Sequence, residues 1–165
     1  MILKQILLEM TICLKTPLGI CEITGDEDGI SEIKILDDQS APTEVIPKIL
    51  IPAVNQIEAY FQGELRDFNF KLNPKGTVFQ KKVWEALNKI PFGATCSYLQ
   101  LSKELGDPKA IRAVAAANGK NPLWIVIPCH RVIGSDGSLT GYAGGLWRKK
   151  WLLDFENPPL QQELF

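Results

Sequence analysis

The clearest helix signals in the sequence lie in residues 97–119, which read SYLQLSKELGDPKAIRAVAAANG. Ser97 and Gln100 form a capping box, a pattern that opens a helix. The run Gly106-Asp107-Pro108 ends this short helix and starts the next one, which Gly119 follows. Two short helices joined in this way predict a helix-turn-helix unit, which DNA-binding proteins and other proteins both use.

The second helix of this pair offers few side chains that could read a base sequence. Its long polar residues are Lys109 at the start, Arg112 in the middle and Asn118 at the end. A helix that reads bases in the major groove presents several donors and acceptors on successive turns. The many alanines instead favour a close approach of the backbone to a partner, with Arg112 as the protruding side chain. The alternative is that alanine is simply the best helix former and packs tightly.

Upstream of this pair, a further capping box predicts another helix. Thr77 and Gln80 open it, apolar residues at helical spacing continue it to about Lys89, and the run Pro91-Phe92-Gly93 ends it. Residues 68–76 are typical of a connection between two lobes.

The first third of the chain predicts strands followed by a helix. Residues 2–14, 19–24 and 30–36 are rich in Ile and Leu, and the acidic turn 25–29 separates the last two as in a hairpin. A helical pattern follows Pro42, with Pro47 near its start, Pro52 as a break and Gly63 at its end.

Composition limits the class of protein. With 165 residues, 45% apolar and 22% charged, the chain suits one compact domain or two small ones. Lys4, Gln5 and Glu9 interrupt the apolar start, which we interpret as a first strand in a cytoplasmic protein and not as a signal peptide. Four cysteines without a C-x-x-C pair indicate reduced thiols, and the single histidine excludes a zinc site built from several histidines.

Charge is distributed unevenly along the chain. Residues 1–72 hold 6 basic and 12 acidic side chains, whereas residues 73–165 hold 12 and 7. This distribution indicates that the C-terminal half meets a polyanion, although solvated surface charge by chance would look the same.

The best candidate for a reactive group lies in residues 121–133, which read NPLWIVIPCHRVI. They predict a buried strand that ends at Cys129 and His130, with Pro128 fixing the backbone before the thiol. A thiol with an ordinary pKa of about 8.5 needs a base or a positive neighbour to react at neutral pH. In an extended segment neighbouring side chains point opposite ways, so His130 would reach the sulfur through a water or a local turn. Glu156, on a helix that follows, is the best candidate to orient the imidazole.

These residues resemble a known family. The run PCHRV at 128–132, preceded by Asn121-Pro122 and followed by GYAGGL at 141–146 and WLLxxE at 151–156, is similar to the O6-alkylguanine-DNA alkyltransferases, the methylated-DNA–protein-cysteine methyltransferases. The similarity covers residues 71–156 closely, with looser support from TPLG at 16–19. It implies an α+β fold, with a small ribonuclease-H-like sheet and helix lobe at 1–72, a mainly helical winged helix-turn-helix lobe at 73–157 and a tail at 158–165.

The resemblance also implies a reaction: the alkyl group of O6-methylguanine in DNA, with O4-methylthymine as a second candidate, passes once and irreversibly to Cys129. No cofactor and no metal are expected, and a monomer is expected to bind double-stranded DNA in the minor groove with the damaged base flipped out. The implied site residues fall into three groups, namely catalytic Cys129, His130, Glu156, Tyr98 and Asn121, DNA-binding Arg112, Tyr98, Ala113, Lys109 and Arg131, and pocket-lining Pro128, Tyr142, Ala143 and Gly144.

Two positions depart from the family pattern. Ala143 stands where some members have a serine whose hydroxyl reaches guanine O6, so a backbone N–H would serve here. Trp147 is bulky where a smaller residue is expected, and either alters the rim of the pocket or covers the surface.

Two other functions remain open at this point. A noncatalytic alkyltransferase-like protein senses lesions without a nucleophilic cysteine, and a cysteine hydrolase usually has its Cys and His far apart in sequence. The tail adds a candidate partner, because Gln161 to Phe165 has the Q-x-x-L-F form of peptides that hold the bacterial sliding clamp. Gln161 would bond at the edge of the clamp's groove, and Leu164 and Phe165 would fill its pocket. The alternative is that Leu164 and Phe165 pack back onto the protein itself.

Overall fold

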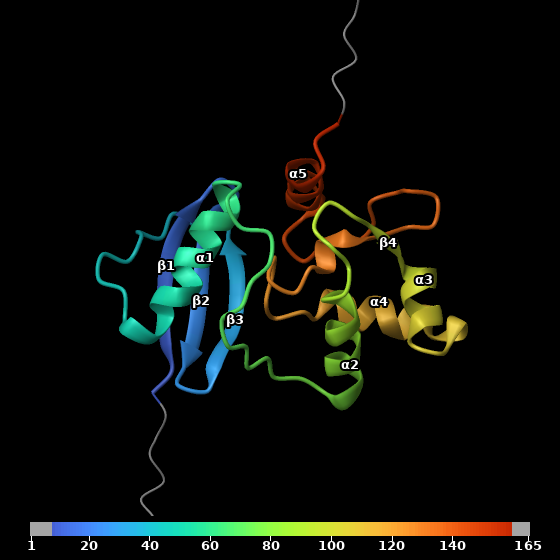
Figure 1. Cartoon of the computed structure of the whole chain (residues 1–165), viewed down its shortest axis with the longest axis horizontal. Helices are drawn as coiled ribbons and strands as arrows, with labels where there is room; N and C mark the ends of the chain where they lie inside the picture. Colours follow the sequence, from blue (N-terminus) through green and yellow to red (C-terminus); the bar gives the residue numbers. More distant parts are fainter. Residues whose placement is uncertain (1–7, 160–165) are drawn as a thin grey trace, which may run out of the picture. The chain divides into compact units, whose positions relative to one another are not determined.

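A computed structural model of the chain describes residues 8–159 (Figure 1). The chain divides into two compact units, and each is described here by itself. The first holds residues up to Lys75 together with Pro122–Val126, and the second holds Gly76–Asn121 and the chain from Ile127 onward. In the described part of the chain, no helix is both long enough and apolar enough to cross a membrane.

A three-stranded antiparallel sheet forms the first unit, as expected for an α+β fold. The strands β1 (Met10–Thr16), β2 (Gly19–Asp26) and β3 (Gly29–Leu36) pair in the order β1-β2-β3. The part of the expected first strand at residues 1–7 lies outside the described residues. The turn between β2 and β3 is tighter than expected, because Asp26 pairs with Gly29 and the ladder is shifted at Thr24/Gly25.

Gly29 shows why this turn needs a glycine. Its φ is 129°, and a Cβ added there would lie 2.9 Å from the Lys71 carbonyl oxygen. The close approach lets the segment that leaves this unit run beside β3, where Ile30 N–H donates to Lys71 O at 2.9 Å.

One helix covers one face of this sheet (Figure 1). The helix α1 (Ile51–Phe61) follows a 3-10 turn, η1 (Lys48–Leu50), and buries Ala53, Val54, Ile57 and Tyr60. The prediction that Pro52 breaks the helix was wrong: it lies in the first turn, where a missing N–H breaks no intrahelical bond. The sheet supplies the other half of this core through alternate residues of its strands, among them Ile12, Cys21, Ile23, Ile33 and Ile35.

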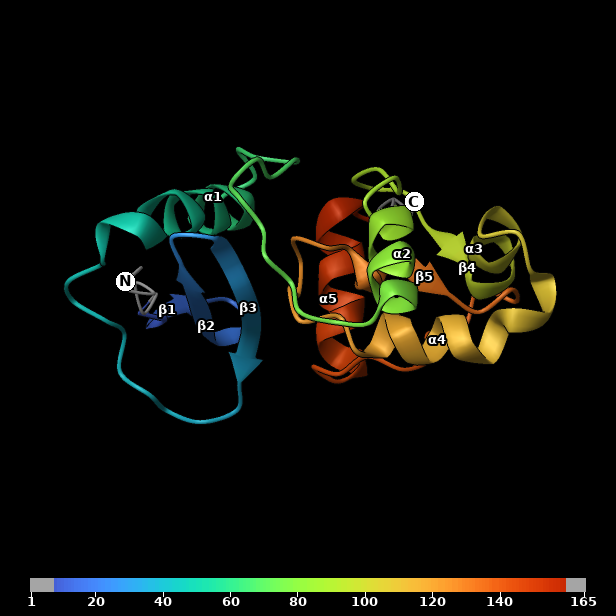
Figure 2. The same cartoon turned by 90° about the horizontal axis from the view of Figure 1, so that it is seen from below.

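The second unit is mainly helical, with α2 (Val78–Leu87), α3 (Tyr98–Glu104), α4 (Ile111–Gly119) and α5 (Leu146–Glu156) (Figure 2). A short parallel pair joins β4 (Cys96–Ser97) to β5 (Val132–Ile133). Both predicted capping boxes are confirmed: Gln80 N–H donates to Thr77 and Gln100 N–H to Ser97, and each glutamine side chain accepts from the cap residue in return.

The helix-turn-helix prediction is confirmed with one refinement. Asp107 caps a 3-10 turn, η2 (Pro108–Ala110), and α4 begins only at Ile111. Gly106 has a φ of 92°, which lets the chain leave α3 sharply. Helix α4 packs against α2 and α3, and the Trp84 indole N–H of α2 donates to Ala117 O of α4 at 2.9 Å.

Candidate functional site

The approach to Cys129 is not the strand that the sequence predicts. Residues 122–128 are irregular, and only Leu123 forms an isolated bridge, to Ile33. The N–H of Val126 bonds to Trp124 O across Ile125, whose φ of 72° is unusual for a β-branched residue. These local bonds and the prolines leave no regular row of donors for a sheet ladder.

Cys129 begins a 3-10 turn, η3 (Cys129–Arg131). The preceding Pro128, with φ −82° and ψ 60°, lets Cys129 N–H bond to Ile127 O at 2.8 Å. From the sequence we predicted that His130 would reach the sulfur either through a water or through a local turn, and the structure has a turn here. The turn replaces the extended geometry that would have sent the two side chains to opposite faces.

Burial dominates the chemistry of the thiol. It raises the pKa of Cys129 to about 11, against opposing effects of Asn121 and Lys149, which lower it. Cys129 forms no disulfide. Because its pKa lies well above 7, the thiol is protonated at neutral pH in the resting protein. Reaction with an electrophile requires that a base remove this proton.

His130, which follows Cys129 directly in the η3 turn, is the residue that the sequence predicts as that base. Its side chain is fully buried, and Nε2 lies 2.7 Å from Glu156 Oε1. Burial lowers the pKa of His130 although Glu156 opposes this, so the ring is neutral at physiological pH. With Nε2–H donating to the carboxylate, Nδ1 carries the lone pair, and Nδ1 has no hydrogen-bond partner within residues 8–159.

Glu156 holds two partners at once. Arg131 donates from Nε to Oε2 at 2.8 Å and from Nη2 to Oε1 at 2.9 Å. Burial would raise the pKa of Glu156, but the hydrogen bonds and charges of His130 and Arg131 lower it to about 2. The carboxylate is ionised and rigidly held, as a group that orients an imidazole needs to be.

Arg131 has a different place from the one the resemblance implies. It is buried, its Nη1 donates to Ile90 O at 2.7 Å, and its guanidinium lies 5.8 Å from the centre of the Phe92 ring. The guanidinium thus supports Glu156 and is not presented at the surface of this structure.

Asn121 supports the turn around the thiol. Its Nδ2 donates to Ile127 O at 2.8 Å, two residues before Cys129, and the side chain is buried. Burial raises the pKa of Cys129, and the hydrogen bond from the Asn121 side chain is the largest of the effects that lower it.

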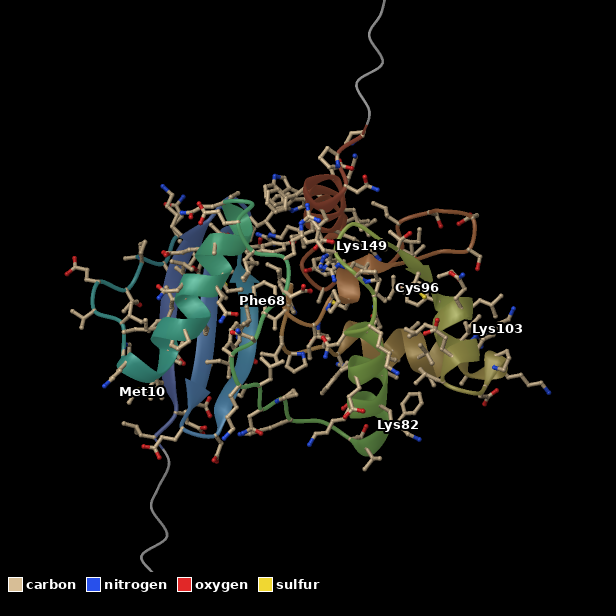
Figure 3. The ribbon with its side chains drawn as sticks, in the orientation of Figure 1. Met10, Phe68, Lys82, Cys96, Lys103 and Lys149 are labelled. Carbon is tan, nitrogen blue, oxygen red and sulfur yellow. The ribbon has the colours of Figure 1, made fainter. Side chains whose placement is uncertain are left out.

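Lys149 is a residue of this region that sequence reasoning missed. Its side chain is fully buried, and Nζ donates to Val132 O at 2.6 Å, Thr140 O at 3.0 Å and Gly141 O at 3.4 Å (Figure 3). Burial lowers the pKa of Lys149 to about 8. Its spacing from Leu152 and Glu156 places all three on one helical face, a signal that could have revealed it.

A pocket of about 490 Å³ lies between α3, α4 and the loop at 140–143. Tyr98 lines it and donates from its hydroxyl to Thr140 O at 3.1 Å. Tyr142 and Ala143 also line it, as does Asn118, which sequence reasoning treated only as the end of a helix. The remaining lining residues are Ile111, Ala115, Gly119, Thr140 and Gly141.

Pro128 and Gly144, which were also expected to line the pocket, are not among its lining residues. Pro128 is buried beside Cys129, and buried Gly144 accepts from Arg148 Nη1 at 3.0 Å. Trp147 is 57% exposed. The Arg148 guanidinium carbon lies over the Trp147 ring, 4.6 Å from the centre of that ring. The tryptophan therefore covers surface and does not narrow the pocket.

The expected DNA-contacting residues of the helix-turn-helix unit are at the surface. Lys109, Arg112 and Ala113 are all exposed, on η2 and on the first turn of α4.

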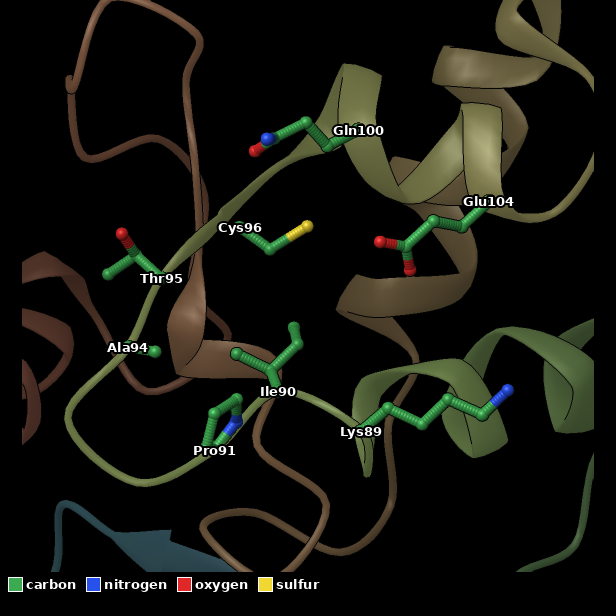
Figure 4. A pocket seen from close by; sticks show the side chains of 8 residues that line it. All are labelled: Lys89, Ile90, Pro91, Ala94, Thr95, Cys96, Gln100 and Glu104. Atoms are coloured by element: carbon green, nitrogen blue, oxygen red, sulfur yellow. The ribbon is translucent and has the colours of Figure 1, made fainter.

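A second thiol, Cys96, lines a different pocket of about 560 Å³. Figure 4 shows its sulfur pointing toward the Glu104 carboxylate. Burial and the negative charge of Glu104 both raise the pKa of Cys96. Cys96 has no histidine among the residues that line its pocket, whereas His130 follows Cys129 directly.

Comparisons with known proteins show the family of the chain. Residues 78–158 match the 6-O-methylguanine DNA methyltransferase DNA-binding domain, and residues 10–74 match the ribonuclease-like domain of the same proteins. A methylated-DNA–protein-cysteine methyltransferase of Methanosarcina acetivorans is 44% identical over 154 residues, covering 86% of this chain and 94% of that protein. The corresponding protein of Methanosarcina barkeri is 45% identical over 153 residues, covering 90% and 97%.

Solved structures give the same result. The O6-methylguanine methyltransferase of Mycobacterium tuberculosis superposes with a TM-score of 0.82 at 39% identity, covering 94% of this chain and 97% of that one. The Mycobacterium tuberculosis OGT in complex with DNA superposes with a TM-score of 0.79 at 41% identity, covering 90% and 92%. With both family domains matched along the sequence and with relatives at 44–45% identity over nearly their whole length, the chain belongs to the methylated-DNA–protein-cysteine methyltransferase family.

Proposed function

We propose that this protein repairs DNA by moving the alkyl group of O6-methylguanine onto its own Cys129, with O4-methylthymine as a second candidate substrate. The observation that carries the proposal is the buried Cys129 followed directly by a neutral His130 whose Nε2 is held by Glu156. The alkyltransferase-like alternative lacks the nucleophilic cysteine that is present here.

The reaction begins with the thiol proton. His130 Nδ1 takes it through a water, and the sulfur then attacks the methyl carbon as the bond to O6 breaks. Displacement at an sp3 carbon suits a soft thiolate and forms no tetrahedral oxyanion. Tyr98 donates to a ring nitrogen of the leaving guanine, and the product thioether resists hydrolysis, so each molecule acts once.

The pocket beside Tyr98 accommodates the flipped base. Tyr142 and Ala143 form one side of it, Pro128 and Gly144 fix the backbone nearby, and the Ala143 N–H serves the O6 position in place of a hydroxyl. Asn121 holds the turn that carries the thiol.

Binding to DNA falls to the exposed start of the recognition unit. Lys109 contacts phosphate, Ala113 permits a close approach in the minor groove, and Arg112 fills the gap that the flipped nucleotide leaves. Flipping costs a few kcal/mol and costs less for a damaged, mispaired base.

The direct test is to weigh the intact protein after incubation with an O6-methylguanine duplex. One added methyl per molecule, located on the Cys129 peptide and absent in Cys129→Ala, supports the proposal. Several product molecules per protein would indicate a hydrolase, and binding without any mass change would indicate a lesion sensor.

The finer setting of the reaction is also proposed. The protein acts as a monomer in the cytoplasm, where thiols stay reduced. Gln161, Leu164 and Phe165, which lie outside the described residues, would hold the sliding clamp and deliver a single-use protein to DNA that is being copied. A labelled peptide of residues 157–165, titrated against the clamp, tests this, with Leu164→Ala and Phe165→Ala together as the control. Equal binding by the control, or no binding at high micromolar clamp, would refute it.

A further inference from the structure

Asn118 is the most unusual polar side chain of the base pocket. It lies near the end of α4, is 4% exposed and lines the same pocket as Tyr98 and Tyr142. Its Oδ1 has no hydrogen-bond partner among the residues that the structure describes. Buried amides normally satisfy both ends, so an amide kept half-satisfied at the edge of a reactive pocket suggests a role in that pocket.

The other end of this amide interacts with Tyr98. Burial raises the pKa of Tyr98, and the hydrogen bond with Asn118 acts in the opposite direction. The Tyr98 hydroxyl gives its own hydrogen to Thr140 O, and Asn118 Oδ1 has no partner among the described residues. The hydrogen bond between the two side chains therefore runs from Asn118 Nδ2 to Tyr98 Oη.

We propose that Asn118 is a positioning residue that holds the Tyr98 hydroxyl and strengthens it as a proton donor to the leaving base. The inference rests on the proposed alkyl transfer. As the sulfur–carbon bond forms and the carbon–O6 bond breaks, the bonding electron pair stays on the guanine. The Tyr98 proton passes to a guanine ring nitrogen, and the phenolate that results is reprotonated from solvent. The thiol proton has meanwhile left through His130, so the protons balance.

The two contacts of the hydroxyl have different fates in this step. The bond from Tyr98 to Thr140 O uses the same hydrogen that must turn toward the base, so this bond breaks when substrate is engaged. A bond from Asn118 Nδ2 uses a lone pair of the phenol oxygen and persists throughout. It grows stronger as negative charge develops on that oxygen, because hydrogen bonds to charged groups are about twice as strong as neutral ones.

The test compares two electrophiles on the full-length protein. Asn118→Leu keeps the size of the side chain and removes the donor. We expect it to slow single-turnover methyl transfer from an O6-methylguanine duplex by roughly tenfold, the loss of one charge-assisted hydrogen bond. Alkylation of Cys129 by iodoacetamide should stay within about twofold, since iodide leaves without a proton.

A double-mutant cycle provides the matched control. Introducing Asn118→Leu into a Tyr98→Phe protein should have no further effect on methyl transfer, because the partner of the amide is already gone. Asn118→Asp, which keeps the shape but offers an ionised acceptor, should lose as much rate as Asn118→Leu. Ultraviolet titration should show a higher tyrosine pKa in Asn118→Leu than in wild type, with the shift absent from the Tyr98→Phe background.

Several outcomes would overturn the inference. Equal losses with the duplex and with iodoacetamide would indicate a structural defect around Cys129, and an undiminished effect in the Tyr98→Phe background would separate Asn118 from Tyr98. Full activity of Asn118→Asp would also contradict it. Failure of the wild-type protein to accept a methyl group would instead refute the proposed function, and that result is read before any variant is compared.

Discussion

Glu156 fixes the tautomer of His130, because its carboxylate Oε1 lies 2.7 Å from Nε2 and leaves Nδ1 as the proton acceptor. The two residues are 26 positions apart in the chain and are brought together by α5 and the η3 turn. A neutral imidazole with a defined free lone pair is what a thiol with a raised pKa requires.

Glu156→Gln should impair both stability and reaction. The substitution leaves the buried Arg131 guanidinium without a counter-charge, which typically costs about 3–5 kcal/mol. An amide also no longer fixes the His130 proton, so methyl transfer should fall by about 100-fold or more. Urea denaturation and single-turnover rates measure the two effects.

Asp154→Asn is the matched control for that substitution. Asp154 lies on the same helix and forms an exposed ion pair with Lys150. Surface pairs of this kind contribute at most about 1 kcal/mol, so both stability and rate should stay close to wild type. Similar losses in the two variants would contradict the assigned role of Glu156.

The contribution of the Glu156 carboxylate to folding stability should disappear in acid. Its folded pKa of about 2 lies below the ordinary value of 4.5, so its contribution to stability is present above pH 4.5 and is lost as pH falls toward 2. Glu156→Gln should therefore approach wild-type stability as pH falls over this range. A stability gap between the two proteins that stays constant from pH 5 to pH 2.5 would refute the pairing.

Arg112→Ala should separate flipping from bond-making. The exposed Arg112 side chain touches DNA in the proposed complex but not the reacting atoms, so repair in duplex DNA should slow by about tenfold or more. Reaction with a free O6-alkylguanine base should be nearly unchanged. The exposed Lys82 on α2 offers a control through Lys82→Ala, and equal losses on both substrates would show that Arg112 acts in some other way.

Binding to undamaged DNA should depend on salt and hardly on sequence. Phosphate contacts from residues such as Lys109 dominate, because α4 presents few groups that read bases. Lys109→Ala should lower the slope of log affinity against log salt by about one. Fluorescence anisotropy on several duplexes tests this, and strong preference for one unmodified sequence would contradict it.

Local signals explain which parts of the fold could be predicted. The Thr77 and Ser97 caps act within four residues, so sequence alone placed the starts of α2 and α3 correctly. The break at Pro52 was wrong because proline is compatible with a first helical turn, and the helix start had been placed too early. The positive φ of Ile125 could not be predicted, since its side chain disfavours it and only the buried surroundings hold it there.

The site was predictable where chemistry is concentrated in a short run and less so where it is assembled from distant segments. Cys129 and His130 are adjacent in sequence, whereas the inward turn of Arg131 depends on Glu156 and on Ile90 O. Asn118 and Lys149 look like a helix end and a surface cation, and their burial follows only from packing around them.

The buried Lys149 makes stability depend on pH in the alkaline range. Its folded pKa of about 8 lies below the ordinary 10.5, so between these values the unfolded chain binds more protons and wild-type stability gains from rising pH. Lys149→Met has no titrating group at this position, so its stability lacks this dependence on pH. The stability difference between wild type and Lys149→Met should therefore shift in favour of wild type from pH 8 to 10.5, by on the order of 2 kcal/mol. Urea denaturation at several pH values measures the shift, with Lys150→Met as an exposed control on the same helix. Parallel pH curves for wild type and Lys149→Met would show that the ammonium is not the group desolvated beneath the loop at 140–141.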